Sequence, residues 1–291
     1  MALEAAGILT LADQQVPRLG YGTMRLTGPG VFGPPADRDE ALAVLRRAVE
    51  LGVRALDTAW YYGPDVADEL VAEALHPYPD DLVLVTKLGG ARGPGGSWRA
   101  ALTAEALAAG AERDLRLLRV DCVPVAHLRW MDGSGVTFDE ALDGMLGLVD
   151  LGLVERIGLS NVSVEQLETA LARTPVATVS NAYSVLDRTH DDLLARCEAL
   201  GIPFLPFFPL GASPAGGSRV AADERLSDLA RRSGATRIQL ALAWLLHRSP
   251  VLLPIPGTSS RAHLEEDLAA ADLALDADVL AELDALAAPG R

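Results

Sequence analysis

Short apolar runs alternate with longer amphipathic stretches along this chain, and the two patterns predict two kinds of element. The apolar runs are rich in Val, Ile, Leu and Phe, as expected of parallel strands whose two faces are both buried. They predict strands over residues 19–24, 54–57, 82–86, 122–126, 155–159, 176–179, 203–207 and 251–254. The amphipathic stretches predict helices over residues 38–51, 66–75, 104–118, 139–151, 164–172, 191–200, 237–247 and 261–270.

Residues at the predicted helix ends support these boundaries. Thr103 and Thr137 stand where a side chain caps a helix N-terminus, and Gly52, Gly152 and Gly201 stand where helices stop. Each predicted strand is followed by a helix. This order predicts an α/β fold, a closed (β/α)8 TIM barrel.

Three segments extend beyond the minimal barrel. Residues 8–11 and 16–18 predict an N-terminal hairpin that caps the barrel floor, and residues 277–287 predict an extra C-terminal helix. The Gly-, Pro- and Ser-rich loop over residues 209–222 predicts a flap over a cofactor or substrate. We find no linker, tandem repeat or charge run, so we expect one domain over residues 1–291.

Composition and charge narrow the function classes. Of 291 residues, 49% are hydrophobic, and 40 acidic against 25 basic residues give a net charge of -15. An acidic surface repels phosphate backbones, which argues against general nucleic-acid binding. Two cysteines cannot build a disulfide framework, and prolines interrupt the longest uncharged stretch, residues 199–218. We expect a cytoplasmic protein, monomeric or weakly homo-oligomeric, that makes no membrane contact.

Among the basic residues there is a single lysine, Lys87. A GC-rich genome that favours arginine codons explains the scarcity of lysine. A lysine retained against that bias indicates a place that needs a compact ammonium with a tunable pKa.

The segment from Gly28 to Gly33 matches the G-x-G-x-x-G pattern of dinucleotide-binding units, and Asp57 follows at a suitable distance. In such a unit the third glycine lies inside the helix, close against the strand. Here Pro34 and Pro35 follow it at once, and the glycines come several residues after the strand. A surface loop is therefore the favoured interpretation.

Active-site residues of TIM barrels lie at the C-terminal ends of the strands. Asp57 ends the second predicted strand, with Tyr62 five residues on; Lys87 ends the third and His127 the fourth. Polar residues follow the fifth and sixth strands: Ser160, Asn161 and Ser180. These side chains are predicted to meet at one barrel mouth.

Their chemistry suits proton donation to an oxygen. Tyrosine has an ordinary pKa of about 10, and an adjacent ammonium such as that of Lys87 lowers it. Asp57 would keep Lys87 charged and in place, and His127 would orient a carbonyl oxygen. The set predicts an acid, Tyr62, that protonates an oxygen while a hydride reaches its carbon.

The sequence resembles the aldo-keto reductases over nearly its whole length. The resembling segments are residues 19–24 (LGYGTM), 56–63 (LDTAWYYG), 85–89 (VTKLG), 157–161 (IGLSN), 207–211 (FFPLG) and 255–267 (IPGTSSRAHLEED). The resemblance implies NADPH-dependent reduction of an aldehyde or ketone on a barrel without a metal. It implies hydride from the nicotinamide, a proton from Tyr62, and the catalytic tetrad Asp57, Tyr62, Lys87 and His127.

The resemblance also implies a binding site for NADP(H), with NAD(H) less favoured. Ser160 and Asn161 would bind the carboxamide, and Phe207 would stack under the nicotinamide. The pyrophosphate would lie along Phe208, Pro209, Leu210 and Gly211. The adenosine 2′-phosphate would lie at the helix N-terminus formed by Gly257, Thr258, Ser259 and Ser260. The remaining implied cofactor residues are Gly22, Thr23, Met24, Asp57, Ser180, His263, Glu266 and Asp267.

Some positions depart from the family pattern. Ser180 stands where many members have Gln, and Asp267 replaces an Asn that contacts adenine. Gly257 stands where a lysine can occur, and His263 where an arginine can, so the positive charge near the 2′-phosphate is reduced. Trp60, Trp98 and Trp130 follow strands two, three and four, and they are expected to form an aromatic substrate pocket or to pack loops.

Two other function classes stay open. A Schiff-base lyase or aldolase would use Lys87 as its nucleophile, although Asp57 and Tyr62 would then be surplus. A non-catalytic barrel subunit that senses NADP is the second alternative, and the complete tetrad argues against it. The physiological substrate is left open by the loops over residues 89–97, 129–136 and 209–222, where aldehydes, ketones, sugars and pyridoxal-like aromatics are all candidates.

Overall fold

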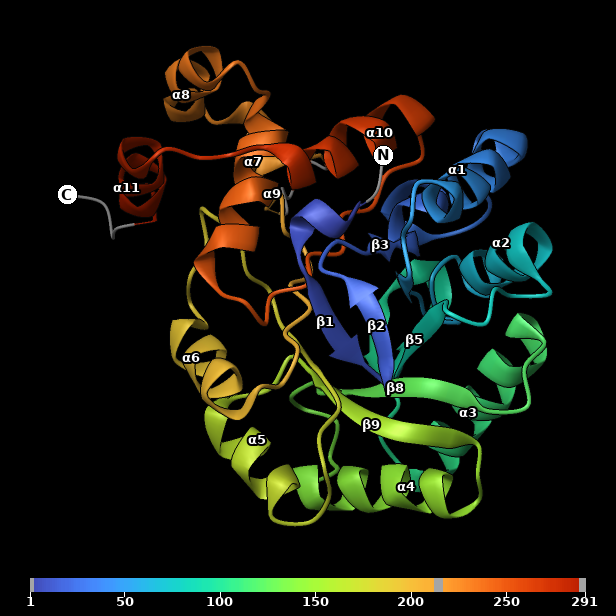
Figure 1. Ribbon diagram of the computed structural model, residues 1–291. Helices are drawn as coiled ribbons and strands as arrows, with labels where there is room; N and C mark the ends of the chain where they lie inside the picture. Colours follow the sequence, from blue (N-terminus) through green and yellow to red (C-terminus); the bar gives the residue numbers. More distant parts are fainter. Residues whose placement is uncertain (1–2, 212–216, 288–291) are drawn as a thin grey trace.

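A computed structural model describes residues 3–211 and 217–287. Its centre is a parallel six-stranded sheet in the order β10-β9-β8-β5-β4-β3, enclosed by helices (Figure 1). The strands of this sheet are β3 (Tyr21–Gly22), β4 (Ala55–Asp57), β5 (Val83–Leu88), β8 (Val123–Arg129), β9 (Val154–Ser160) and β10 (Val179–Ser180).

Two further extended segments close the sheet into a barrel. Residues 203–207 pair with β10, since the Leu205 N–H donates to the Val179 oxygen at 2.7 Å. Residues 251–256 pair with them, since the Leu253 N–H donates to the Phe204 oxygen at 2.9 Å. They also pair with β3, where the Gly20 N–H donates to Pro254 at 2.9 Å. The predicted (β/α)8 barrel is therefore confirmed.

Helices follow the strands and cover the outside of the barrel (Figure 1). The α-helices are α1 (Arg38–Glu50), α2 (Val66–Leu75), α3 (Ala104–Leu118), α4 (Phe138–Asp150), α5 (Val164–Leu171), α6 (Asp191–Leu200), α7 (Arg219–Ala222), α8 (Arg225–Ser233), α9 (Arg237–Arg248), α10 (Arg261–Leu268) and α11 (Ala277–Ala285). Thr103 and Thr137 cap α3 and α4, and Gly201 ends α6 in the left-handed conformation, as the sequence predicts.

The N-terminal hairpin closes one end of the barrel. Strands β1 (Ile8–Leu11) and β2 (Gln14–Pro17) pair antiparallel and lie across the barrel in Figure 1. Leu11 and Val16 are fully buried in a cluster with side chains from the barrel strands, among them Val85 and Leu253. This apolar plug fills the floor and leaves the opposite end, where the strands terminate, for polar side chains.

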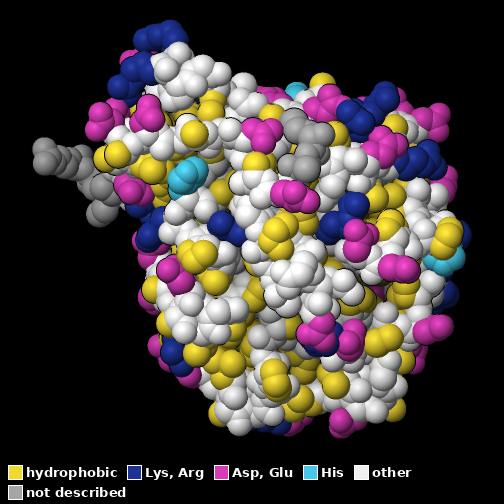
Figure 2. All heavy atoms as spheres, viewed as in Figure 1, with side chains coloured by type: hydrophobic (Ala, Val, Ile, Leu, Met, Phe, Trp, Pro, Cys, Tyr) yellow, Lys and Arg dark blue, Asp and Glu magenta, His cyan; other side chains and the backbone are white. Residues whose placement is uncertain are grey.

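Charged side chains of both signs are mixed over the face in Figure 2. Many are paired, such as Arg38 with Glu73 at 2.6 Å and Arg54 with Asp81 at 2.5 Å. Exposed pairs of this kind contribute little stability. Within residues 3–211 and 217–287, no helix has the length and apolar character needed to cross a membrane.

The structure contains elements that the sequence pattern misses. Residues 89–97, expected as a loop, include β6 (Gly90–Arg92), which pairs with β7 (Trp98–Ala100) in an antiparallel hairpin. Helix α8 is likewise unpredicted. The expected flap over residues 209–222 contains α7, and its residues 212–216 lie outside the described part of the chain.

The glycine motif lies in a surface loop, as expected. A short 3-10 turn, Pro29–Val31, occupies its middle, and the Gly28 N–H donates to the Gly33 oxygen at 2.9 Å. Helix α1 begins only at Arg38. A dinucleotide-binding unit requires a tight glycine turn that leads from a strand directly into a helix, and these glycines form no such turn.

Candidate active site

The strand ends opposite the hairpin surround a cavity of about 660 Å³. Asp57 enters it from the end of β4, and Lys87 from β5. Tyr62 enters from the segment between β4 and α2, and Ser160 from the end of β9. Of the four residues predicted to form a tetrad, Asp57, Tyr62 and Lys87 therefore line this cavity.

Lys87 and Asp57 form an ion pair through Nζ and Oδ1. Their side chains are only 3% and 5% exposed. Among the ion pairs of the described residues, no other has both side chains buried. Burial raises the pKa of Asp57, and the Lys87 ammonium opposes that rise. Each charge is therefore held in a poorly solvated place by the other.

Tyr62 lines the cavity and is 7% exposed. Burial, with a smaller contribution from Asp57, raises the pKa of its hydroxyl above the ordinary value. The cation that opposes this rise is Arg129. The Lys87 Nζ lies 5.6 Å from the Tyr62 ring centroid, and its charge is already paired with Asp57. The expected lowering of the Tyr62 pKa by Lys87 is therefore wrong for this structure: burial dominates.

Tyr61 differs from its neighbour in its surroundings. It is fully buried, its ring packs edge-on against Tyr62 at 5.3 Å, and it does not line the cavity. Of the two adjacent tyrosines, only Tyr62 lines the cavity.

His127 pairs in register with Lys87 on the neighbouring strand, yet it is fully buried and is not among the cavity-lining residues. Its Nε2 lies 2.6 Å from the Thr178 hydroxyl. Burial, helped by repulsion from the Lys87 ammonium, holds its pKa well below the ordinary value. The imidazole is therefore neutral at physiological pH, and its ring faces Thr178 rather than the cavity.

Arg129 is a site residue that the sequence analysis does not single out. It ends β8 and lines the cavity beside Tyr62 and Lys87. Its position could have been inferred from its spacing to His127. Residues two apart on a strand share one face, and Arg129 follows His127 by two residues.

A buried pair of carboxyl groups lies behind the end of β4. Asp68 on α2 and Asp114 on α3 are both fully buried. The Thr58 hydroxyl donates to Asp68 at 2.6 Å, and the Trp60 N–H donates to Asp114 at 3.1 Å. Burial raises the pKa of Asp68 to about 6 and that of Asp114 well above its ordinary value. Since Thr58 adjoins Asp57 in the chain, this network helps to fix the end of β4.

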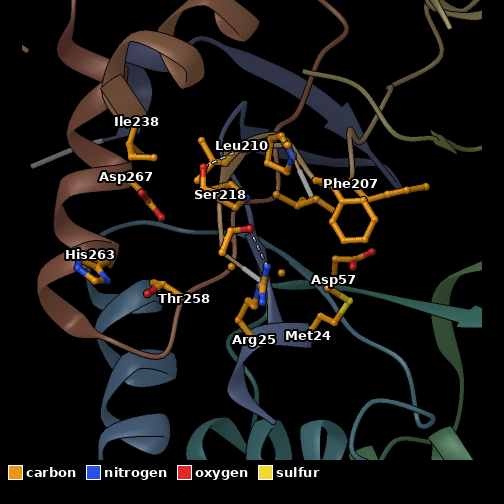
Figure 3. Close-up of a pocket in the computed structure, with 18 of the residues that line it drawn as sticks. Met24, Arg25, Asp57, Phe207, Leu210, Ser218, Ile238, Thr258, His263 and Asp267 are labelled. Atoms are coloured by element: carbon orange, nitrogen blue, oxygen red, sulfur yellow. Dashed lines mark hydrogen bonds between the residues drawn. The ribbon is translucent and has the colours of Figure 1, made fainter. Parts of the chain in front are cut away.

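The cavity is elongated, and the end at Asp57 and the far end are lined by different elements. Figure 3 shows Met24, Asp57 and Phe207 at one end, and Thr258, His263 and Asp267 at the other. At the far end, burial, with a smaller contribution from Glu266, raises the pKa of Asp267 to about 7. Ser260 caps the N-terminus of α10 there.

Most of the predicted cofactor residues line this cavity. They are Gly22, Met24, Asp57, Ser160, Phe207, Phe208, Pro209, Leu210, Gly211, Gly257, Thr258, His263, Glu266 and Asp267. Further lining residues were not singled out from the sequence: Arg25, Arg129, Gly217, Ser218, Ala221, Ile238, Ile255 and Pro256.

Other predicted residues lie away from the cavity lining. Thr23 is buried and donates to Thr58 at 2.9 Å, and the Asn161 side chain donates to the Trp130 oxygen at 3.0 Å. The predicted residues outside the lining are Thr23, His127, Asn161, Ser180, Ser259 and Ser260. At Gly257 any Cβ would lie 2.4 Å from the Gly22 oxygen, so this backbone leaves no room for a lysine.

Only Trp98 of the three predicted pocket tryptophans lines the cavity. The Trp60 ring packs against the Arg113 guanidinium at 4.6 Å. The Trp130 indole donates to Asp132 at 2.8 Å and packs against a neighbouring aromatic ring. Trp60 and Trp130 therefore pack loops, which corrects their assignment to the substrate pocket.

The site defines an oxidoreductase of a known class. The sequence pattern described as the Aldo/keto reductase family matches residues 18–288, and the chain belongs to this family. It is 43% identical to Pyridoxine 4-dehydrogenase of Escherichia coli (strain K12), over 97% of this chain and 99% of that protein. It is 35% identical to an uncharacterized oxidoreductase of Schizosaccharomyces pombe, over 96% of this chain and 89% of that protein.

A solved structure agrees with this membership. The aldo/keto reductase from Klebsiella pneumoniae in complex with NADP and acetate superposes with a TM-score of 0.80 at 30% identity. The match covers 98% of this chain and 96% of that one. The relatives therefore include an enzyme seen with the cofactor that the sequence predicts.

Proposed function

We propose that this protein reduces the carbonyl group of a small aldehyde or ketone with NADPH. The observation that carries the proposal is the buried Lys87–Asp57 pair at one end of an elongated cavity, with the Lys87 Nζ 5.6 Å from the centroid of the Tyr62 ring. A proton donor lines that end, and the lining continues to Thr258, His263 and Asp267 at the other end.

The lining residues fit NADP(H). The Ser160 hydroxyl oxygen is buried and has no hydrogen-bond partner among the residues described, so it is available to a carboxamide. Phe207 offers an apolar surface beside it. At the far end lies the N-terminus of α10, where the positive end of the helix dipole favours a phosphate, although the Arg261 N–H already donates to Glu40 and the His263 N–H to the Ser260 hydroxyl. We assign the nicotinamide to the first place and the adenosine 2′-phosphate to the second.

Charges at the far end oppose one another. Arg25 and His263 line the cavity and favour a phosphate, whereas Glu266 and Asp267 disfavour one when ionised. The raised pKa of Asp267, about 7, reduces this repulsion because part of the population is neutral near neutral pH. We therefore expect the preference for NADPH over NADH to increase as pH falls below 7.

Tyr62 supplies the proton. Its raised pKa keeps the hydroxyl protonated at neutral pH, so the acid form is present when a carbonyl oxygen arrives. The reduced nicotinamide, when bound, supplies the hydride to the carbonyl carbon. The phenolate left on Tyr62 is then stabilised by the neighbouring positive charge of Arg129.

Lys87 and Asp57 act together. Asp57 holds the ammonium in the cavity wall beneath the Tyr62 ring, and Lys87 keeps the buried carboxylate ionised. We assign to His127 the role of a neutral neighbour on the adjacent strand, because its pKa is low and its Nε2 is engaged by Thr178.

The first substrate to test is the pyridoxine–pyridoxal pair. The support is the 43% identity to Pyridoxine 4-dehydrogenase over nearly the whole of both chains. Pyridoxal carries an aromatic aldehyde, which the exposed Trp98 ring in the cavity wall can contact.

The testing experiment is NADPH consumption over a panel of carbonyl compounds that includes pyridoxal, with NADH in parallel. We expect turnover with aldehydes and faster turnover with NADPH than with NADH. Two outcomes would replace the proposal: borohydride trapping of a substrate on Lys87, which indicates a Schiff-base enzyme, or NADPH binding with no turnover of any carbonyl.

A further inference from the structure

Arg129 lines the cavity, and its charge effect on Tyr62 leaves the hydrogen-bond donors of its guanidinium without a role. It ends β8, two residues after His127, so both side chains belong to the inward face of that strand. His127 is fully buried and turned to Thr178, whereas Arg129 lines the cavity. The polar group of β8 that a bound substrate meets is therefore a guanidinium.

The fold makes no use of the N–H groups of this guanidinium. Within residues 3–211 and 217–287, Arg129 forms no ion pair and donates no side-chain hydrogen bond, and its Nε is buried without a partner. An unpaired buried donor is costly, and most arginines of this chain, such as Arg113 with Asp65, are paired. A planar fork of five N–H donors matches the two oxygens of a carboxylate.

The surroundings define what would bind. The Arg129 Cζ lies 5.7 Å from the centroid of the Trp98 ring, which supplies an aromatic wall at the same end of the cavity. Tyr62 lies close enough that the charge of Arg129 acts on its hydroxyl. The nearby carboxylate Asp57 is neutralised by Lys87, so Arg129 leaves this end of the cavity with a net positive charge.

We propose that Arg129 is the substrate-anchoring residue: it binds an anionic oxygen carried next to the reacting carbonyl. The favoured substrates are aromatic aldehydes with a neighbouring carboxylate or phenolate. Trp98 contacts the ring, Arg129 holds the anion, and the carbonyl oxygen is left to Tyr62. The inference rests on the proposed carbonyl reduction and names the substrate class for it.

The test uses three aldehydes with one ring: 2-carboxybenzaldehyde, 2-hydroxybenzaldehyde and benzaldehyde. We expect Arg129→Met to lower the ratio of kcat/KM for 2-carboxybenzaldehyde over benzaldehyde by about 10- to 100-fold, as the loss of a charge-assisted hydrogen bond predicts. The loss should appear mainly in KM, because the anchor acts in the ground state as well. Arg129→Lys should restore part of the ratio, and it carries the test if Arg129→Met does not fold. Comparing the carboxylate with the phenol shows which anion is preferred.

Arg92 offers a matched control. Its guanidinium packs on the same Trp98 ring at 3.9 Å, but it donates to the Gly30 oxygen and does not line the cavity. Arg92→Met should keep the wild-type ratio. An unchanged ratio in both Arg129 variants, or an equal fall in Arg92→Met, would overturn the proposal.

Benzoate binding, measured by calorimetry, separates this inference from the proposed function. We expect benzoate to bind the wild type and Arg92→Met equally, and Arg129→Met about 10- to 100-fold more weakly. If the wild type reduces none of the aldehydes but binds benzoate through Arg129, the carbonyl-reduction proposal fails and the anion site stands. If Arg129→Met binds benzoate as tightly as the wild type while carbonyl reduction proceeds, the anchoring role of Arg129 is refuted and the carbonyl-reduction proposal stands.

Discussion

Replacing Lys87 with Met removes one partner of a buried ion pair and leaves the Asp57 carboxylate behind. Both side chains are almost fully buried, at 3% and 5% exposure, and the Asp57 Oδ2 has no hydrogen-bond partner in the described part of the chain. Breaking a buried pair costs about 3–5 kcal/mol, because an uncompensated charge stays in a poorly solvated place. At roughly 2–4 °C per kcal/mol for a large domain, Tm should fall by about 6–20 °C.

The pH dependence of this loss follows from the carboxyl. Burial already raises the pKa of Asp57 in the folded protein, and without Lys87 nothing nearby opposes the rise. A raised folded-state pKa means that the folded protein binds more protons than the unfolded chain, so stability decreases as pH rises. The Tm difference between Lys87→Met and the wild type should therefore be larger at pH 8 than at pH 5.

Thermal unfolding followed by circular dichroism at both pH values is the assay. Adding Asp57→Asn to Lys87→Met removes the orphaned charge, so the double variant should regain most of the lost Tm and its pH dependence should disappear. Carbonyl reduction should stay absent in both. A Lys87→Met protein that melts like the wild type, or a deficit that Asp57→Asn leaves unchanged, would refute the buried pair.

Two further predictions use the other buried carboxyls. Asp114→Asn replaces the more strongly protonated member of the Asp68–Asp114 pair with a neutral side chain. Since both folded-state pKa values are raised, wild-type stability falls as pH rises, and the variant should gain stability relative to the wild type between pH 4 and pH 8 in urea unfolding. A stability difference between variant and wild type that stays constant from pH 4 to pH 8 would contradict the raised pKa of Asp114. Asp267→Asn removes a carboxyl with a pKa of about 7 from the far end of the cavity. It should tighten NADPH binding at pH 8 more than at pH 6, measured by tryptophan fluorescence, and equal tightening of NADH would place the 2′-phosphate elsewhere.

The barrel was predictable because its elements are local in the sequence. Strands such as β5 are short runs rich in apolar and β-branched residues, and helices such as α4 begin after a capping threonine. The antiparallel β6–β7 hairpin was missed because the glycines at Gly93, Gly95 and Gly96 read as a plain loop. Helix α8 was missed because its sequence is strongly polar.

The sequence predicted which strand ends carry the polar residues of the site, but not how their side chains are oriented. The prediction that Asp57, Lys87 and His127 lie near the ends of neighbouring strands places them at one end of the barrel, but it does not orient the His127 ring. The turn of His127 to Thr178 and the approach of Arg129 to Tyr62 depend on packing across the barrel. Trp60 and Trp98 look alike in sequence, and only tertiary contacts decide which one reaches the cavity.

The most direct test of the account is the rate of carbonyl reduction by Tyr62→Phe, with Tyr61→Phe as its control. The substitution removes only the hydroxyl in the cavity, so NADPH binding, followed by fluorescence, should be retained. Loss of a general acid should lower kcat and kcat/KM together by about 10²–10⁴-fold. Tyr61 is buried outside the cavity, so Tyr61→Phe should keep most of the activity. If Tyr62→Phe reduces carbonyls at the wild-type rate, another group supplies the proton and the assignment of this site is wrong.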